Sequence, residues 1–230
     1  MSRTRTRAAA AVVEDAPPER PDRKQAILLA AEKLFASHGY HAVSLRQIAE
    51  EAGVPLALVG YYYGQKHELF QAIFQHWSKT LEERLVGLNE AMAAPPRQRL
   101  QRLVVAFTTP VLKLRASPEG EYYAMLVARE LYHSREETEQ VLRAHFDPLA
   151  HAYIDALEQL LPGADRATAA WAYQFMLGTL LHHLSDNRVE RLSRGQARAG
   201  DPAVAGLLQN YIVGGLRAAF VPRAAATKAD

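Results

Sequence analysis

The stretch SLRQIAEEAGVPLALVGYYYGQK, residues 44–66, decides how the chain folds. Ser44 is followed three positions later by Gln47, a capping-box pattern in which each side chain satisfies the other's backbone N–H, so a helix is predicted to begin there. Gly53 tolerates the positive φ of a tight turn, and Pro55 suits the start of the next helix. The stretch therefore predicts two short helices that meet at a sharp angle, a helix-turn-helix.

The second helix of this pair, about residues 55–62, carries no formal charge. It is short enough to enter a DNA major groove end-on, because that groove is about 12 Å wide. A helical hairpin in any all-α protein can show the same turn. The pattern by itself leaves that alternative open.

The segments on either side of this stretch are also helical by period. Asp22 with Gln25 resembles another capping box, and the apolar spacing that follows predicts a helix that ends near Gly39 and packs behind the helix-turn-helix. After it, one longer helix is predicted from Gln65 to about Leu88.

The rest of the chain shows helical periodicity with capping residues between segments and no strand-like alternation. The fold class is therefore predicted as all-α, with about nine helices. Pro110 and Pro148 lie inside helical patterns, where a proline kinks or splits a helix or only shapes its packing. The further helices are expected at residues 97–116 and 118–133, at 135–161 after a Ser134/Glu137 cap, and at 166–189 and 202–220.

Composition narrows the class of protein. The 230 residues include no cysteine, which excludes disulfides and thiolate chemistry. No run approaches the roughly 18 apolar residues of a membrane span, so a cytoplasmic location is expected. The net charge is +2, and residues 1–66 hold nine Lys and Arg against seven acids, so the excess lies at the end with the helix-turn-helix. A few placed contacts, and not a strongly basic surface, would then bind DNA.

The chain from residue 23 to 75 resembles the TetR family of bacterial transcriptional regulators. The residues that carry the resemblance are the capped helix with IAEEAGV, the short second helix, the pair Tyr62-Tyr63 and Lys66. Two positions depart from the family pattern: Gly60 stands where a tyrosine is frequent, and Pro55 replaces a small hydroxyl residue.

The resemblance implies DNA-contacting positions in this chain. Ser44 and Arg46 match second-helix positions that touch the DNA backbone and base edges. The groove-facing positions match Leu56, Ala57 and Tyr61. The phosphate contacts match Tyr62 and Lys66. With Pro55 between the two helices, the candidate DNA-binding residues are Ser44, Arg46, Pro55, Leu56, Ala57, Tyr61, Tyr62 and Lys66.

The resemblance also implies a small effector bound in the second half, where aromatic and Met side chains gather. The same side chains at helical spacing also form ordinary core. Arg129 is the candidate anchor for an anionic group, or pairs with another helix. The candidate effector-binding residues are Phe107, Met125, Arg129, Tyr132, Phe146, Tyr153, Trp171 and Phe175.

The last two helices carry apolar stripes with small residues, which the resemblance assigns to a homodimer interface. An intramolecular core is the alternative. His182, His183 and Asp186 give only a weak metal pattern, so no metal or cofactor is predicted. The candidate dimerisation residues are Tyr173, Leu177, Leu181, Leu184, Leu208, Tyr211, Ile212 and Gly215.

The predicted organisation is a disordered basic arm over residues 1–21, a DNA-binding head over 22–68, an effector-binding and dimerisation domain over 69–222, and a disordered tail over 223–230. The predicted function is a homodimeric repressor that releases a palindromic operator when a small hydrophobic or aromatic effector binds. An α-helical enzyme or a protein-interaction module is the alternative, although no nucleophile, base and acid constellation and no phosphate-binding loop stands out.

Overall fold

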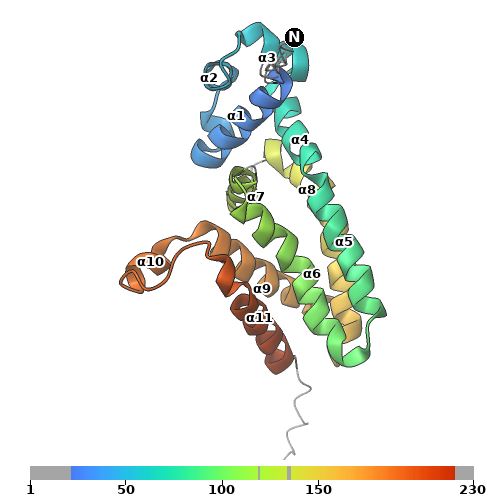
Figure 1. Ribbon diagram of the computed structural model, residues 1–230. Coiled ribbons are helices and arrows are strands. Elements are labelled where there is room, and N and C mark those ends of the chain that lie inside the picture. The colour runs from blue at the N-terminus through green and yellow to red at the C-terminus, as the bar shows by residue number, and fades with distance from the viewer. Residues whose placement is uncertain (1–21, 119, 134–135, 221–230) are drawn as a thin grey trace, which may run out of the picture.

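The computed structural model of the chain describes residues 22–118, 120–133 and 136–220. Regular structure in these ranges is entirely helical, with α-helices α1 to α11 and two short 3-10 helices. Figure 1 shows a small head of helices above a longer bundle. The all-α prediction is confirmed. The predicted arm with Arg3, Arg5 and Arg7, the tail and the Ser134 cap lie outside the described residues.

The head is built from short helices whose ends are set by local capping. Asp22 caps α1 by accepting a hydrogen bond from the Lys24 N–H at 2.9 Å. The predicted capping box at Ser44 is present, because its N–H donates to Gln47 Oε1 at 2.8 Å and its hydroxyl accepts from the Gln47 N–H at 3.3 Å. Gly53 has a φ of 64°. The head helices are α1 (Arg23–His38), η1 (Tyr40–Ala42), α2 (Leu45–Glu51), α3 (Leu56–Tyr63) and α4 (Lys66–His76).

The single long helix predicted after Gln65 is wrong: the chain forms α4 and then α5 (Ser78–Ala93), separated at Trp77. Trp77 leaves helical geometry, with φ −97° and ψ 9°. Its indole N–H donates to the Glu32 carboxylate of α1 at 2.7 Å, and its ring stacks on Tyr123 at a centroid distance of 5.5 Å. These tertiary contacts hold the side chain where a continuous helix is interrupted, so head and bundle meet at a break.

The bundle contains the remaining helices. Pro110 and Pro148 lie inside α6 and α8, and neither proline ends its helix. The helix predicted over 166–189 stops earlier, since Ser185 ends α9 and a separate short α10 follows. The bundle helices are α6 (Pro96–Ala116), α7 (Glu121–His133), α8 (Glu136–Leu160), α9 (Arg166–Ser185), α10 (Arg188–Leu192), η2 (Pro202–Val204) and α11 (Ala205–Ala219).

Two clusters of buried side chains form the core. The head cluster does not stop at residue 68, because it includes Phe70 and Phe74 of α4 and Tyr123 and Leu126 of α7. The bundle cluster is formed by α5, α6, α8, α9 and α11, together with Ala128 of α7. Tyr123 therefore belongs to the packing that joins the head to the bundle. Among the described residues, no helix is both long enough and apolar enough to span a membrane.

Candidate functional site: a DNA-binding head and a buried cavity

Helix α3 presents an exposed, uncharged face at the end of the head. Val59 is fully buried and seats the helix, while Tyr61 is 79% exposed and its ring meets that of Tyr62 at 5.1 Å. Leu56 and Ala57 are exposed at its first turn. This arrangement leaves the predicted groove-facing side chains accessible to a ligand as large as a DNA duplex.

The angle of α3 is held by contacts with α1. The Tyr63 hydroxyl donates to the Lys24 carbonyl at 2.8 Å, and the Lys24 ammonium lies 5.8 Å from the ring centre of Tyr63. The pKa of Tyr63 is raised to about 12 by burial and by the nearby Asp22. Tyr63 thus remains a hydrogen-bond donor at neutral pH.

Lys66 lies at the junction of the head helices. Its ammonium donates to the carbonyls of Tyr40 and Val43, each at 3.0 Å, and lies 4.3 Å from the ring centre of Tyr40. These contacts brace the turn before α2, which carries the exposed Ser44 and Arg46. The structure therefore shows a bracing role for Lys66, whereas its phosphate contact stays a prediction.

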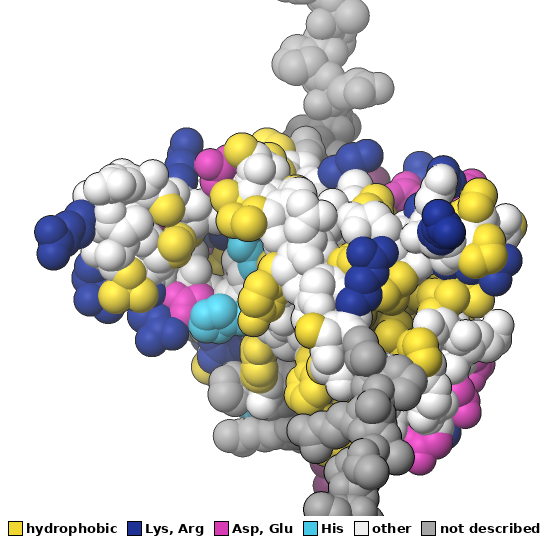
Figure 2. All heavy atoms as spheres, turned by 90° about the horizontal axis from the view of Figure 1, so that it is seen from below, with side chains coloured by type: hydrophobic (Ala, Val, Ile, Leu, Met, Phe, Trp, Pro, Cys, Tyr) yellow, Lys and Arg dark blue, Asp and Glu magenta, His cyan; other side chains and the backbone are white. Residues whose placement is uncertain are grey.

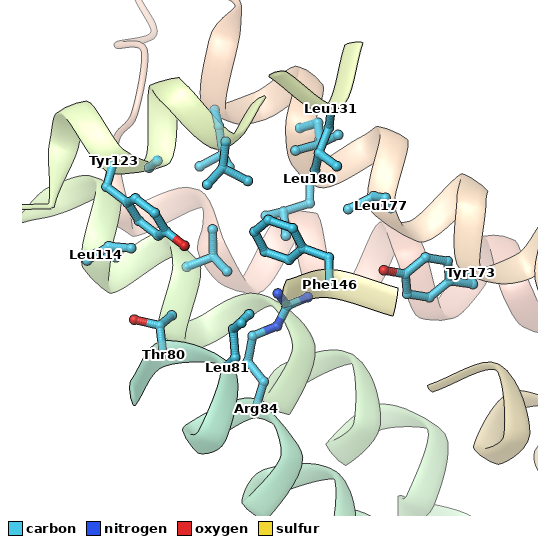
Figure 3. Close-up of a pocket in the computed structure, with 15 residues that line it drawn as sticks. Thr80, Leu81, Arg84, Leu114, Tyr123, Leu131, Phe146, Tyr173, Leu177 and Leu180 are labelled. Atoms are coloured by element: carbon cyan, nitrogen blue, oxygen red, sulfur yellow. The ribbon is translucent and has the colours of Figure 1, made fainter. Parts of the chain in front are cut away.

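A partly enclosed cavity lies in the bundle among α5, α6, α7, α8 and α9 (Figure 3). Its volume is about 60 Å³, several times the roughly 10–15 Å³ that one water needs. The wall is mostly aliphatic. The residues that line it are Thr80, Leu81, Arg84, Val111, Leu114, Tyr123, Ala124, Val127, Leu131, Phe146, Tyr173, Leu177, Leu180, Leu181 and Leu184.

Arg84 is the one cation among the described residues that line this cavity. It is only 5% exposed, and its Nε and Nη2 atoms have no hydrogen-bond partner among the described residues. Its guanidinium lies 4.2 Å from the ring centre of Phe107, which supports a buried cation through the negative face of the ring. Burial lowers the pKa of Arg84.

Sequence reasoning missed Arg84. Its position does carry a signal, because Leu81, Arg84 and Leu88 fall at helical spacing on one face of α5, and the two leucines face the core. A charged residue on an otherwise apolar helix face is the pattern that finds it. Burying an unpaired charge costs folding free energy, so a buried arginine without an acidic partner seldom serves only to fill a core.

Two tyrosine hydroxyls point toward the Arg84 guanidinium from either side of the cavity (Figure 3). They belong to Tyr123 of α7 and Tyr173 of α9, and the Tyr123 oxygen is buried without a partner among the described residues. Burial raises the pKa of both phenols. Both remain protonated donors near neutral pH.

The structure divides the predicted effector-binding residues among four places. Phe146 lines the cavity. Phe107 and Tyr153 are buried beside Arg84, where the Tyr153 hydroxyl donates to the Arg84 carbonyl at 2.9 Å. Met125 packs against the head cluster. The others lie outside the cavity lining, and they are Arg129, Tyr132, Trp171 and Phe175.

Arg129 lies at the contact between head and bundle. Its Nη2 donates to the carbonyl of His38, the last residue of α1, at 3.2 Å. A Cβ atom built on the neighbouring Gly39 would come within 2.9 Å of the same nitrogen. The side chain therefore connects α7 to the end of α1 and does not reach the cavity.

The predicted dimerisation residues also separate. Those on α9 face inward: Tyr173, Leu177, Leu181 and Leu184 all line the cavity. On α11, Ile212 is buried and Leu208 is partly buried, whereas Tyr211 and Gly215 are exposed.

An outward apolar face is formed by other residues of the same two helices. Trp171 and Phe175 of α9 are 63% and 57% exposed, and their rings stack at 5.9 Å. Leu207 and Tyr211 of α11 are 71% and 70% exposed. Seen from below, hydrophobic side chains gather over the middle of the bundle, next to the arginine-rich segment around α10 at the left (Figure 2).

The histidines of α9 do not form a cluster with three potential metal ligands in the described chain. His182 Nε2 lies 3.4 Å from Asp186 Oδ2. Asp186 also accepts from Arg188 Nε at 2.7 Å, and this arginine lowers the pKa of the carboxyl to about 2. The carboxylate therefore belongs to an ion pair at the start of α10.

Two family models match the chain. Residues 27–73 match the model described as bacterial regulatory proteins, tetR family. Residues 105–215 match the model described as tetracyclin repressor-like, C-terminal domain. Together they include the helix-turn-helix and most of the helices that line the cavity.

Curated relatives are named as regulators. The HTH-type transcriptional activator FasR of Mycolicibacterium smegmatis is 32% identical over 90 residues, 38% of this chain and 40% of that protein. The HTH-type transcriptional regulator BetI of Agrobacterium fabrum is 29% identical over 151 residues, 65% of this chain and 70% of that protein. The chain thus spans about two fifths of the length of FasR and about two thirds of this BetI.

Solved structures share the fold at lower identity. The fatty acid degradation regulator FadR of Bacillus halodurans has a TM-score of 0.59 at 21% identity, covering 86% of this chain and 98% of that one. AmtR of Mycobacterium smegmatis has a TM-score of 0.59 at 20% identity, covering 89% and 90%. With the helix-turn-helix formed in the structure and both family models matched, the chain belongs to the TetR family of bacterial transcriptional regulators.

Proposed function

We propose that this regulator is a homodimeric, cytoplasmic repressor that binds a palindromic operator and releases it when a small, largely apolar effector enters the bundle cavity. The observation that carries the proposal is the pairing of the exposed helix α3 with a partly enclosed cavity whose wall shares Tyr123 with the packing of the head. The first feature binds DNA and the second gives a ligand a way to affect that binding.

The head supports major-groove docking. Helix α3 is seated by Val59 and Tyr63, so its exposed side can enter the groove without distorting the head. Arg46 at the first turn of α2 is exposed and suits a phosphate or base-edge contact. Because α3 itself has no charge, few phosphates are neutralised and the salt dependence of binding should be modest.

The outward face of α9 and α11 supports the homodimer. Exposed aromatic side chains such as Trp171 and Tyr211 are the kind of residue that anchors an interface. Added Cβ atoms at Gly178 and Gly215 would meet nothing within 4 Å in this chain, so a second copy can approach the backbone closely there. Two heads related by a two-fold axis would then bind two half-sites.

A continuous chain of contacts supports the effector response. Tyr123 lines the cavity and stacks on Trp77, and the Trp77 indole donates to Glu32 of α1. A ligand that moves the Tyr123 ring therefore acts on the break between α4 and α5 and on the first helix of the head. The operator-bound and operator-free arrangements of the head then bind the effector with different free energies, and DNA affinity falls by that difference.

Fluorescence anisotropy tests the proposal directly. The protein is titrated against labelled duplexes from its own upstream region and against a scrambled duplex, at two salt concentrations, with the mass of the complex determined by analytical ultracentrifugation. Saturable binding that prefers the native duplex, with two chains per duplex, is expected. Equal binding to both duplexes, or none, would contradict it and favour an enzyme or a protein-interaction module.

A variant pair tests the dimer face. Tyr211→Glu places a charge on the outward face of α11 and should lower both the dimer fraction and operator affinity. Glu82→Arg, on the exposed side of α5, is the control for a change of surface charge and should leave the dimer intact. A Tyr211→Glu protein that remains dimeric would remove this face from the proposal.

A further inference from the structure

The bundle cavity holds a cation with two unused hydrogen-bond donors. Nε and Nη2 of Arg84 are buried and have no hydrogen-bond partner among the described residues, and Arg84 is one of the residues that line the cavity. These two nitrogens form one edge of the guanidinium, with their N–H bonds nearly parallel. That edge matches the two oxygens of a carboxylate, which accepts both hydrogen bonds at once.

The guanidinium is held in place without an acid. Its central carbon lies 4.2 Å from the centre of the Phe107 ring, and the Arg84 carbonyl accepts a hydrogen bond from the Tyr153 hydroxyl. None of the described residues that line the cavity is an Asp or Glu. The positive charge is therefore oriented but not neutralised by the cavity wall.

The surface beyond the guanidinium is apolar. Leucines of four helices form much of the wall, and they include Leu81 of α5, Leu114 of α6, Leu131 of α7 and Leu177 of α9. The polar side chains of the lining are Thr80, Arg84, Tyr123 and Tyr173, and the hydroxyls of the two tyrosines point toward the guanidinium (Figure 3). The cavity thus has one cationic end with two phenol donors and a hydrocarbon remainder.

We propose that the effector is an amphiphile with one carboxylate and an apolar tail, and that its carboxylate accepts hydrogen bonds from Nε and Nη2 of Arg84. The phenols of Tyr123 and Tyr173 supply further donors. The tail lies against the leucines, which move apart to admit it, because about 60 Å³ is less than half of the roughly 150 Å³ in which an apolar cavity holds benzene. The assignment deepens the proposed function and rests on it. It names the chemistry of the ligand and the residue that selects it.

A monoanion fits this site better than the other classes of ligand. A neutral ligand would leave the buried cation unpaired, which is costly in an apolar wall. A dianionic phosphate ester would carry more negative charge than the single guanidinium neutralises. A cationic ligand would face Arg84 as a like charge. One carboxylate balances one guanidinium.

Isothermal titration calorimetry with a matched set of straight-chain ligands tests the assignment. Octanoate, octanol, octyl phosphate and octylamine each have one unbranched chain of eight carbons and differ in the polar group at its first carbon. Octanoate is expected to bind about tenfold to a hundredfold more tightly than octanol, the range for hydrogen bonds to a charged group. Equal binding of octanoate and octanol, or tighter binding of octyl phosphate, overturns the assignment.

Substitution of Arg84 shows whether this side chain causes the preference. Arg84→Met keeps an apolar side chain of similar length and should bind octanol while losing the preference for octanoate. Arg84→Lys keeps the charge but not the two-nitrogen edge, so its octanoate affinity should lie between the two. Arg97→Met, on the exposed start of α6, should change neither affinity. Octanoate preference retained in Arg84→Met overturns the proposal.

The two proposals fail separately. Operator binding without any octanoate binding, in protein that melts cooperatively, overturns the ligand assignment and leaves the regulator intact. Arg84-dependent octanoate binding without preference for the upstream duplex supports the ligand assignment and overturns the repressor. Release of the operator by octanoate, lost in Arg84→Met and present in Arg97→Met, supports both.

Discussion

The buried carboxyl of Glu32 makes the stability of this protein depend on pH in an unusual direction. Glu32 is 1% exposed in α1, and burial raises its pKa to about 7 despite the hydrogen bond from Trp77. The proposed perturbation is Glu32→Gln, which keeps an oxygen to accept the Trp77 indole N–H and removes the charge. The fold and the contact at the helix break should survive the change.

The direction and the size of the pH dependence follow from the difference between the pKa of Glu32 in the folded and in the unfolded state. The folded state holds the Glu32 proton more tightly than the unfolded state, so the stabilisation is fully present below a pH of about 4.5 and is lost as pH rises through about 7. At about 1.36 kcal/mol for each pKa unit, the difference corresponds to roughly 3 kcal/mol. Roughly 2 to 3 kcal/mol of this is expected to be lost between about pH 5 and about pH 8.

Urea denaturation of wild type and Glu32→Gln at about pH 5 and about pH 8 measures the effect. Other groups contribute to the wild-type curve, so the quantity compared is the difference in unfolding free energy between the two proteins. The unfolding free energy of Glu32→Gln minus that of wild type should be larger at about pH 8 than at about pH 5, by roughly 2 to 3 kcal/mol. Glu82→Gln, on the exposed side of α5, is the control and should show no such shift. A difference that stays constant with pH would refute the reasoning.

Four further outcomes are expected. Gly60→Ala should raise the stability of α3 by about 0.5–1 kcal/mol, measured by thermal melting, because an added Cβ meets nothing within 4 Å; a lower melting temperature would show that the position is not open. Lys66→Ala should lower the free energy of unfolding by about 1–3 kcal/mol, because the Tyr40 and Val43 carbonyls lose their hydrogen-bond donor, and should weaken binding to all duplexes. An unchanged melting temperature would exclude the bracing role. Tyr61→Ala should leave the melt unchanged and narrow the affinity gap between native and scrambled duplexes, and a preserved gap excludes it from base reading. Arg129→Ala removes the hydrogen bond from α7 to the end of α1, so it should weaken the release of the operator by the effector and leave operator affinity without effector intact. Loss of operator affinity without effector would indicate a role of Arg129 in folding.

Local signals in the sequence were sufficient for the head. The Ser44 and Gln47 box, the positive φ at Gly53 and the helix that begins after Pro55 all depend on residues within a few positions of one another. Such features form wherever the short segment is placed. The helix-turn-helix and the all-α class were accordingly predictable from residues alone.

The break at Trp77 was not predictable in this way. At this break the Trp77 side chain donates a hydrogen bond to Glu32, which lies 45 residues earlier in the chain, and stacks on Tyr123, which lies in a later helix. The periodicity of the segment runs through the break unchanged. Only the tertiary structure places the partners that interrupt the helix.

The two faces of α9 were the main difficulty for the candidate sites. Apolar residues occur around much of this helix, so periodicity does not say which stripe faces inward. The structure places Leu181 in the lining of the cavity and leaves Trp171 exposed, whereas the sequence assigned Leu181 to the dimer interface and Trp171 to the effector site. The size of a side chain was a poor guide there, because the fit of neighbouring helices decides which face is buried.

The open position at Gly60 has a consequence for how this regulator can evolve. A new side chain there would point away from the head without displacing any neighbour, whereas the adjacent Val59 is fully buried and keeps the helix seated. A change of one codon can therefore add a side chain to the exposed face of α3 without first disturbing the fold of the head. Under the proposed function, gene duplicates would acquire separate operators through that residue and would inherit the same cavity and the same scaffold.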